Sequence, residues 1–107
     1  MAESPLENEI VVGEIVEAEE FKKARKPGLA KLVIDLGSRE VNSAAQLLYH
    51  HEVEDLPGTR VLCVTDLGEV NIAGFKSEVL TLGVPGDDGN PVLVTPEEEV
   101  PLGGGLY

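Results

Sequence analysis

The stretch from Glu9 to Ala18, EIVVGEIVEA, decides the fold of this chain. Its β-branched composition is typical of a strand, but the polar positions Glu9, Glu14 and Glu17 do not keep one parity, so the apolar face changes midway. A strand of this kind usually contains a bulge or a bend, and Gly13 stands at the break. A strand shared between two sheets of a small barrel needs such a break.

Further strands follow this first one. The segment 29–36, LAKLVIDL, alternates cleanly, with Leu32 and Ile34 on one face and Lys31 and Asp35 on the other. The remaining predicted strands are a short third strand at 39–43, a central strand at 60–66, a fifth strand at 70–84 interrupted at Gly74 and Ser77, and a short additional strand at 91–94.

Only the segment 44–58, AAQLLYHHEVEDLPG, has a helical composition, which predicts a helix of at most two or three turns that ends at Pro57-Gly58. Five principal strands with one short helix between strands three and four predict an all-β fold, a five-stranded OB-fold barrel. The expected organisation is an N-terminal extension at 1–8, one OB-fold domain at 9–84 and a C-terminal extension at 85–107.

The chain has no run of about 18 uncharged apolar residues, and its N-terminus, MAESPLENE, lacks the basic and apolar segments of a secretory signal. We therefore expect a cytoplasmic protein without membrane insertion. The single cysteine, Cys63, lies in the apolar run VLCV and is expected to be a small buried hydrophobe rather than a reactive thiol.

The charge is strongly negative, with 20 Asp and Glu against 8 Lys and Arg and a formal net charge of −12. An acidic surface of this kind favours adaptation to a very salty cytoplasm, as in a halophilic protein, over the alternative of a basic partner such as a cationic peptide. Half of the basic residues, Lys22, Lys23, Arg25 and Lys26, nevertheless lie within five positions. This cluster is either a loop that contacts anions or a solvated turn.

Nothing in the sequence indicates catalysis. The candidate bases are His50 and His51, which have no Gly-x-Ser-x-Gly motif to accompany them and, being adjacent, point in different directions. The glycines at 103–105 do not lead into a helix as a phosphate-binding loop would, and Glu97-Glu98-Glu99 is typical of a solvated surface. We expect no enzyme activity, no metal site and no cofactor.

Several strings resemble the CsaA group of the tRNA-binding-domain family, which is related to the C-terminal domain of methionyl-tRNA synthetases. They are VVGEIVEAE (11–19), ARKPG (24–28), KLVIDLG (31–37), IAGFKSEVLTLGV (72–84) and VPLGGGLY (100–107), in the same order and spacing. The resemblance implies a non-enzymatic OB-fold whose terminal extensions pair two copies into a homodimer. It implies tRNA or tRNA-like RNA as the partner or, alternatively, unfolded preprotein bound on the same face by an export-related chaperone.

Carried over position by position, the resemblance implies one set of RNA- or peptide-binding residues around the OB face. They are Lys22, Lys23, Arg25, Lys26, Asn42, Ser43, Gln46, Lys76, Ser77 and Glu78. For Ser43 and Gln46, hydrogen bonding at a strand end or a helix cap is a nearly equal interpretation.

The chain departs from the family pattern at four places. Leu29-Ala30 stand where an aromatic is common, and Val41-Asn42 stand where a basic residue is common. Asp66 replaces an asparagine, and residues 69–71 replace a basic loop. These changes remove positive charge, stacking surface and an amide. RNA recognition is therefore expected to rest on shape and phosphate contacts.

Overall fold

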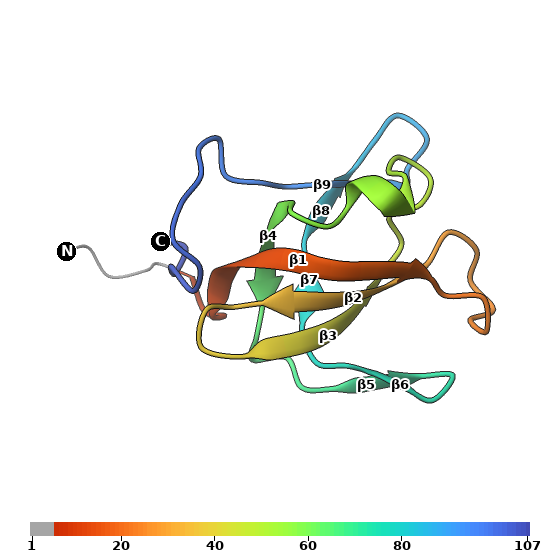
Figure 1. Cartoon of the computed structure of the whole chain (residues 1–107), viewed down its shortest axis with the longest axis horizontal. Helices are drawn as coiled ribbons and strands as arrows, with labels where there is room; N and C mark the ends of the chain where they lie inside the picture. Colours follow the sequence, from red (N-terminus) through yellow and green to blue (C-terminus); the bar gives the residue numbers. More distant parts are fainter. Residues whose placement is uncertain (1–5) are drawn as a thin grey trace.

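A computed structural model describes residues 6–107; most of the expected N-terminal extension, residues 1–5, lies outside the described residues. The described chain forms the elements β1 (Ile10–Glu20), β2 (Ala30–Asp35), β3 (Glu40–Ala45), η1 (Val53–Asp55), β4 (Arg60–Val64), β5 (Val70–Ile72), β6 (Phe75–Ser77), β7 (Leu80–Thr81), β8 (Gly83–Pro85) and β9 (Pro91–Leu93). Five strands form one antiparallel sheet in the order β3-β2-β1-β4-β7, and β5–β6 and β8–β9 are separate hairpins (Figure 1). This nearly closed barrel confirms the predicted all-β OB-fold.

The core is aliphatic and follows the alternation of β2. Leu32 and Ile34 are completely buried, whereas Lys31, Val33 and Asp35 are only half-buried on the outer face of the sheet. The predicted alternation of this strand is therefore confirmed. Cys63 is also completely buried in the core, as expected, and burial raises the pKa of its thiol to about 11.

The change of face in β1 occurs later than the position of Gly13 suggests. β1 pairs with β4 from Ile10 to Glu14 and with β2 from Glu14 to Glu20, and its register with β2 shifts between Ile15 and Glu17. Gly13 has a different role, because a Cβ atom there would lie 2.5 Å from Cγ2 of Ile34. The glycine lets a buried side chain of β2 pack directly on the backbone of β1.

The barrel closes between β3 and residues 77–81 along a line that we call the seam, through one backbone hydrogen bond and several bonds made by side chains. The backbone N–H of Glu78 donates to the carbonyl of Asn42 (2.8 Å). Oγ of Ser77 accepts a hydrogen bond from the backbone N–H of Ala44 (3.0 Å), and Oε1 of Glu78 accepts one from the N–H of Asn42 (2.9 Å). Inside the barrel, the hydroxyl groups of Ser43 and Thr81 lie 2.8 Å apart. The seam thus satisfies the edge of β3 without a continuous backbone ladder.

The segment 44–58 begins with the last two residues of β3 and continues as turns, irregular backbone and one three-residue 3₁₀ helix, η1, instead of the two or three helical turns allowed by its composition. The backbone N–H of Leu48 bonds the carbonyl of Gly28 (3.0 Å), outside the segment. Leu47 and Leu56 are both buried and bring the ends of the segment into the core. These tertiary contacts compete with helical hydrogen bonds, and propensity alone is too weak to prevail.

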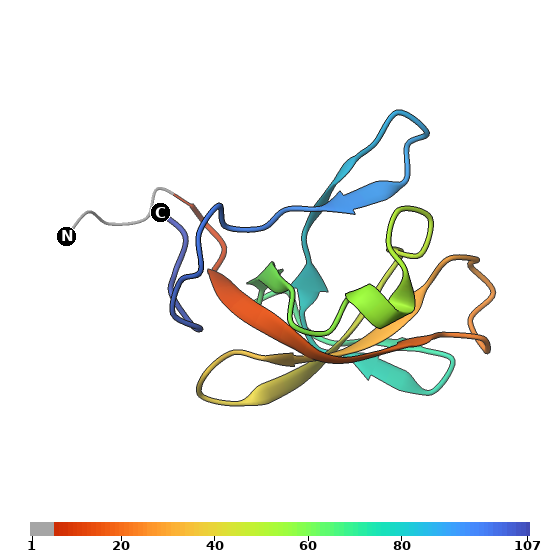
Figure 2. The same ribbon diagram turned by 45° about the horizontal axis from the view of Figure 1, so that its top comes forward.

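The predicted fifth strand at 70–84 is divided into four short strands. Ala73 and Gly74 both have positive φ angles, 47° and 86°, and make the tight turn of the β5–β6 hairpin. The interruption at Gly74 was predicted, whereas Ala73 was not expected in the turn because a non-glycine residue seldom adopts a positive φ angle. The additional strand, β9, pairs with β8, and the two hairpins lie on opposite sides of the barrel (Figure 2).

The C-terminal segment returns to the first strand. The N–H of Gly103 bonds the carbonyl of Val12 (2.8 Å), and the N–H of Leu106 bonds that of Ile10 (2.8 Å). Arg60 holds the preceding residues through Nε to the Val100 carbonyl (3.3 Å) and also pairs with Glu14. Residues 103–106 thereby protect an edge of β1 that β2 leaves free.

Candidate functional site

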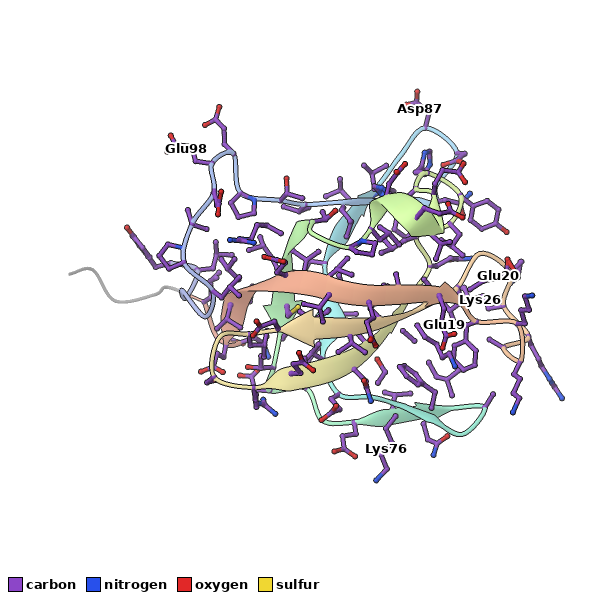
Figure 3. All side chains as sticks on the ribbon, in the orientation of Figure 1. Glu19, Glu20, Lys26, Lys76, Asp87 and Glu98 are labelled. Carbon is purple, nitrogen blue, oxygen red and sulfur yellow. The ribbon has the colours of Figure 1, made fainter. Side chains whose placement is uncertain are left out.

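The four clustered cations project from the loop between β1 and β2, residues 22–28, which we call the basic loop. Lys22, Lys23, Arg25 and Lys26 are all exposed, and none of them takes part in an ion pair among the described residues. Figure 3 shows Lys26 on this loop, at the end of the molecule opposite the C-terminus. Because no described carboxylate neutralises these cations, their charge is available to a ligand.

The segment that follows β3 holds the basic loop in place. Nε2 of Gln46 donates a hydrogen bond to the carbonyl of Pro27 (3.0 Å), and the N–H of Leu48 donates one to Gly28 (3.0 Å). Gly28 has a φ of 74°, which suits glycine, and a Cβ atom there would lie 2.5 Å from Cε2 of Tyr49. Contacts from Gln46, Leu48 and Tyr49 therefore fix the base of the loop, while its cations remain exposed.

A groove of about 800 Å³ runs along the basic loop. Lys23, Arg25 and Lys26 line one part of it. Much of the remaining lining is apolar and comes from Ala45, Ile72, Leu80, Leu82 and Pro91. An apolar groove beside a cluster of cations can hold a ligand that combines an apolar body with negative charge.

The structure does not bring all the predicted site residues together. Gln46 lines the groove next to the basic loop, as described above. By contrast, the hydroxyl of Ser43 is completely buried and donates to the carbonyl of Val79 (3.1 Å), and Ser77 and Glu78 serve the seam. The hydroxyl of Ser43 thus makes a structural hydrogen bond from inside β3, and its part in ligand binding stays a prediction.

The other two predicted residues lie away from the basic loop. Asn42 is half-buried on β3, with its backbone in the seam. Lys76 lies on β6 and forms an ion pair of 3.8 Å with Glu69 (Figure 3). Its charge is thus partly compensated, unlike that of the basic loop.

Sequence reasoning missed a cluster of Phe21, Lys31 and Phe75. The two aromatic rings meet edge to face with centroids 5.5 Å apart, and Nζ of Lys31 lies 5.3 Å from the Phe21 centroid. Lys31 also pairs with Glu19 at 2.9 Å. Phe75 arrives through the β5–β6 hairpin, so the local sequence carries no signal for this contact, which fastens the hairpin to the outer face of the sheet.

The two histidines hold the β8–β9 hairpin. Nε2 of His50 lies 2.8 Å from Oδ1 of Asp88, and hydrogen bonds from the N–H of Asn90 and from His50 lower the pKa of this carboxyl to about 2. Nε2 of His51 accepts a hydrogen bond from the N–H of Leu93 (3.4 Å), while burial and the neighbouring His50 lower the pKa of His51. Both side chains thus have structural partners.

Residues 6–107 contain no group of three or more His, Cys, Asp and Glu side chains arranged to hold a metal ion. Over the same residues, no helix is long and apolar enough to cross a membrane.

Comparison with known proteins connects this geometry to a family. Residues 10–104 match the family model described as "Putative tRNA binding domain". The crystal structure of the CsaA chaperone protein from Picrophilus torridus superposes with a TM-score of 0.85 at 35% identity, covering 94% of this chain and 92% of that chain. Chaperone CsaA from Bacillus anthracis gives a TM-score of 0.83 at 34% identity, covering 94% and 90%.

Among curated proteins, the methionine–tRNA ligase of Methanocaldococcus jannaschii is 34% identical over 92 residues, which are 86% of this chain and 14% of the ligase. The chain thus corresponds to a small part of that relative, whereas it spans nearly the whole length of both CsaA structures. From the matched family model, the shared barrel and these two structures, we conclude that the chain belongs to the tRNA-binding-domain family and is a CsaA-like member of it.

Proposed function

We propose that the chain is a non-enzymatic, cytoplasmic protein that binds tRNA or tRNA-like RNA, with the basic loop on the phosphates. The observation that carries this proposal is the group of four exposed cations without carboxylate partners, in a chain whose net charge is −12. Such a cluster of cations can bind phosphates, whereas the acidic side chains on the rest of the surface repel them.

The negative charge outside the loop contributes to selectivity. Glu19 and Glu20 lie at the end of β1 beside the loop, and Asp87 and Glu98 lie on other parts of the surface (Figure 3). Polyanionic RNA is repelled by these carboxylates and attracted only where the cations project. RNA whose backbone fits this small patch is therefore favoured over RNA in general, which is recognition by shape.

A titration with an unmodified tRNA transcript over a range of KCl concentrations tests this function. Four phosphate contacts predict that log K falls with log [KCl] with a slope of about −3 to −4. Filter binding measures both the affinity and the slope. Absence of saturable binding at 0.05 M KCl would exclude the proposed function.

Binding of unfolded preprotein is the second candidate, and the apolar groove favours it. Leu80 is 47% exposed on β7 and lines the groove together with Ile72 and Leu82. An extended peptide with acidic and apolar residues would complement this groove and its cations. If peptide is the ligand, Leu80→Glu abolishes peptide binding, and the same peptide competes with tRNA for the intact protein.

We propose that two copies form a homodimer through the C-terminal segment. Leu106 and Tyr107 are 40% and 75% exposed although the segment is paired with β1. Val12, Pro101 and Leu106 also line an apolar pocket of about 250 Å³ in which side chains of a second copy could pack. Light scattering at micromolar concentration should give the dimer mass for the intact chain and the monomer mass after deletion of 100–107.

A further inference from the structure

Tyr49 is an exposed aromatic ring held at the base of the basic loop. Tyr49 is 47% exposed. Carbons Cδ2 and Cε2 of the ring lie 2.7 and 2.5 Å from the position that a Cβ atom of Gly28 would occupy. The ring therefore packs on bare backbone at Gly28, where any larger residue would displace it.

The position of this ring relative to the cations is fixed by the surrounding hydrogen bonds. Gly28 follows Lys26 by two residues. Gln46 and Leu48, which shortly precede Tyr49 in the chain, both donate hydrogen bonds to the basic loop. His50, the next residue, is anchored to Asp88. Tyr49 is thus attached to rigid structure on both sides of its own backbone and needs little ordering when a ligand arrives.

A rigid, exposed aromatic beside phosphate-binding cations has the chemistry of a nucleotide site. Bases stack on aromatic rings irrespective of their identity because every base has a π face, and neighbouring cations hold the phosphate of the same nucleotide. Tyr49 does not line the groove, which runs along Lys23, Arg25 and Lys26. The stacking surface is therefore separate from the groove, although both adjoin the basic loop.

We propose that Tyr49 is a stacking platform for one unpaired base of the bound RNA, adjacent to the phosphates held by the basic loop. This inference rests on the proposed function and assigns to it a contact that the sequence did not indicate. Because a stacked base must be free of its pairing partner, the site selects RNA with an unpaired nucleotide close to the contacted phosphates.

Substitution of the ring distinguishes stacking from a merely structural role. Tyr49→Leu retains an apolar side chain against Gly28 and should lower the affinity for a tRNA transcript by about 5-fold to 100-fold, whereas Tyr49→Phe should stay within about 2-fold of the original protein. The salt slope should not change in either variant, because no phosphate contact is lost. A fully base-paired RNA duplex should bind the original protein and Tyr49→Leu equally.

Fluorescence reports the stacking directly. The chain has no Trp and two Tyr, so in the Tyr107→Phe background Tyr49 is the sole tyrosine. We expect the tRNA transcript to quench its emission with the midpoint seen in filter binding, after an inner-filter correction made with free tyrosinamide. The paired duplex should leave the emission unchanged.

Three outcomes would contradict the inference, and they differ from failure of the proposed function. Stacking would be overturned if Tyr49→Leu bound tRNA as tightly as the original protein, or if tyrosine emission did not change at saturation. Either result would leave the proposed RNA binding intact. A reduced salt slope in Tyr49→Leu would show that the ring only positions the loop. Absence of tRNA binding by the original protein would instead overturn the proposed function itself.

Discussion

Replacing Lys22, Lys23, Arg25 and Lys26 by alanine is expected to weaken tRNA binding at least about 100-fold at 0.1 M KCl. Each phosphate contact contributes nearly one unit to the slope of log K against log [KCl]. At 0.1 M KCl, which is tenfold below 1 M, each contact therefore raises the affinity by close to a factor of ten. Four contacts together then supply about three decades. The remaining carboxylates repel RNA, which further weakens what is left of binding.

A matched pair of variants separates the loop from the overall charge. Lys23→Ala with Lys26→Ala changes the net charge from −12 to −14, and the single substitution Arg39→Glu does the same. Arg39 is exposed in the turn between β2 and β3, at the other end of these strands from the basic loop (Figure 1). The loop variant should lose about two units of slope, and Arg39→Glu almost none. Equal losses in the two variants would show that the basic loop has no special role.

The melting temperature is expected to rise by roughly 10–20 °C between 0.05 and 3 M KCl. The chain carries 12 more acids than bases within a radius of gyration of 13.4 Å. At 0.1 M salt the Debye length is about 10 Å, so carboxylates repel one another over much of the molecule, whereas at 1 M it is only about 3 Å. Removing this repulsion should stabilise the folded state by roughly 2–4 kcal/mol, which corresponds to that shift for a domain of this size.

The charge itself can be varied to check this expectation. Glu97 and Glu98 are exposed and form no ion pair among the described residues, and replacing both by glutamine makes the net charge less negative, from −12 to −10. The double variant should melt at a higher temperature in 0.05 M KCl and depend less on salt. A melting temperature that stays flat or declines with KCl would remove the salt-adaptation hypothesis and favour a basic partner.

Features encoded by neighbouring residues were predictable from the sequence. The alternation of β2 follows from the period of a strand, and it placed Leu32 and Ile34 in the core. The concentration of cations at 22–26 is likewise a local property and needed no knowledge of the fold. Where local propensity met tertiary contacts, as in the segment 44–58, the contacts decided the structure.

Features that depend on distant partners could not be derived in this way. Ser43 and Thr81 are 38 positions apart, and Asn42 and Glu78 are 36 apart. Ser43, Ser77 and Glu78 were predicted to contact a ligand, and in the fold their side chains bond across the seam. Conversely, Tyr49 was not predicted to contact RNA, because only the folded chain brings it against Gly28 at the base of the basic loop.

The seam also determines where the barrel opens first. Its backbone N–H groups at Asn42 and Ala44 bond the side chains of Glu78 and Ser77, and only one backbone pair, from the N–H of Glu78 to the carbonyl of Asn42, supplements them. A side-chain acceptor can swing away by torsion about one or two bonds. A ladder such as β1–β2 separates only when several backbone pairs break together. We therefore expect β3 to part from residues 77–81 while the rest of the sheet stays paired, a sub-global opening that would expose the amides of Asn42 and Ala44 to exchange with solvent.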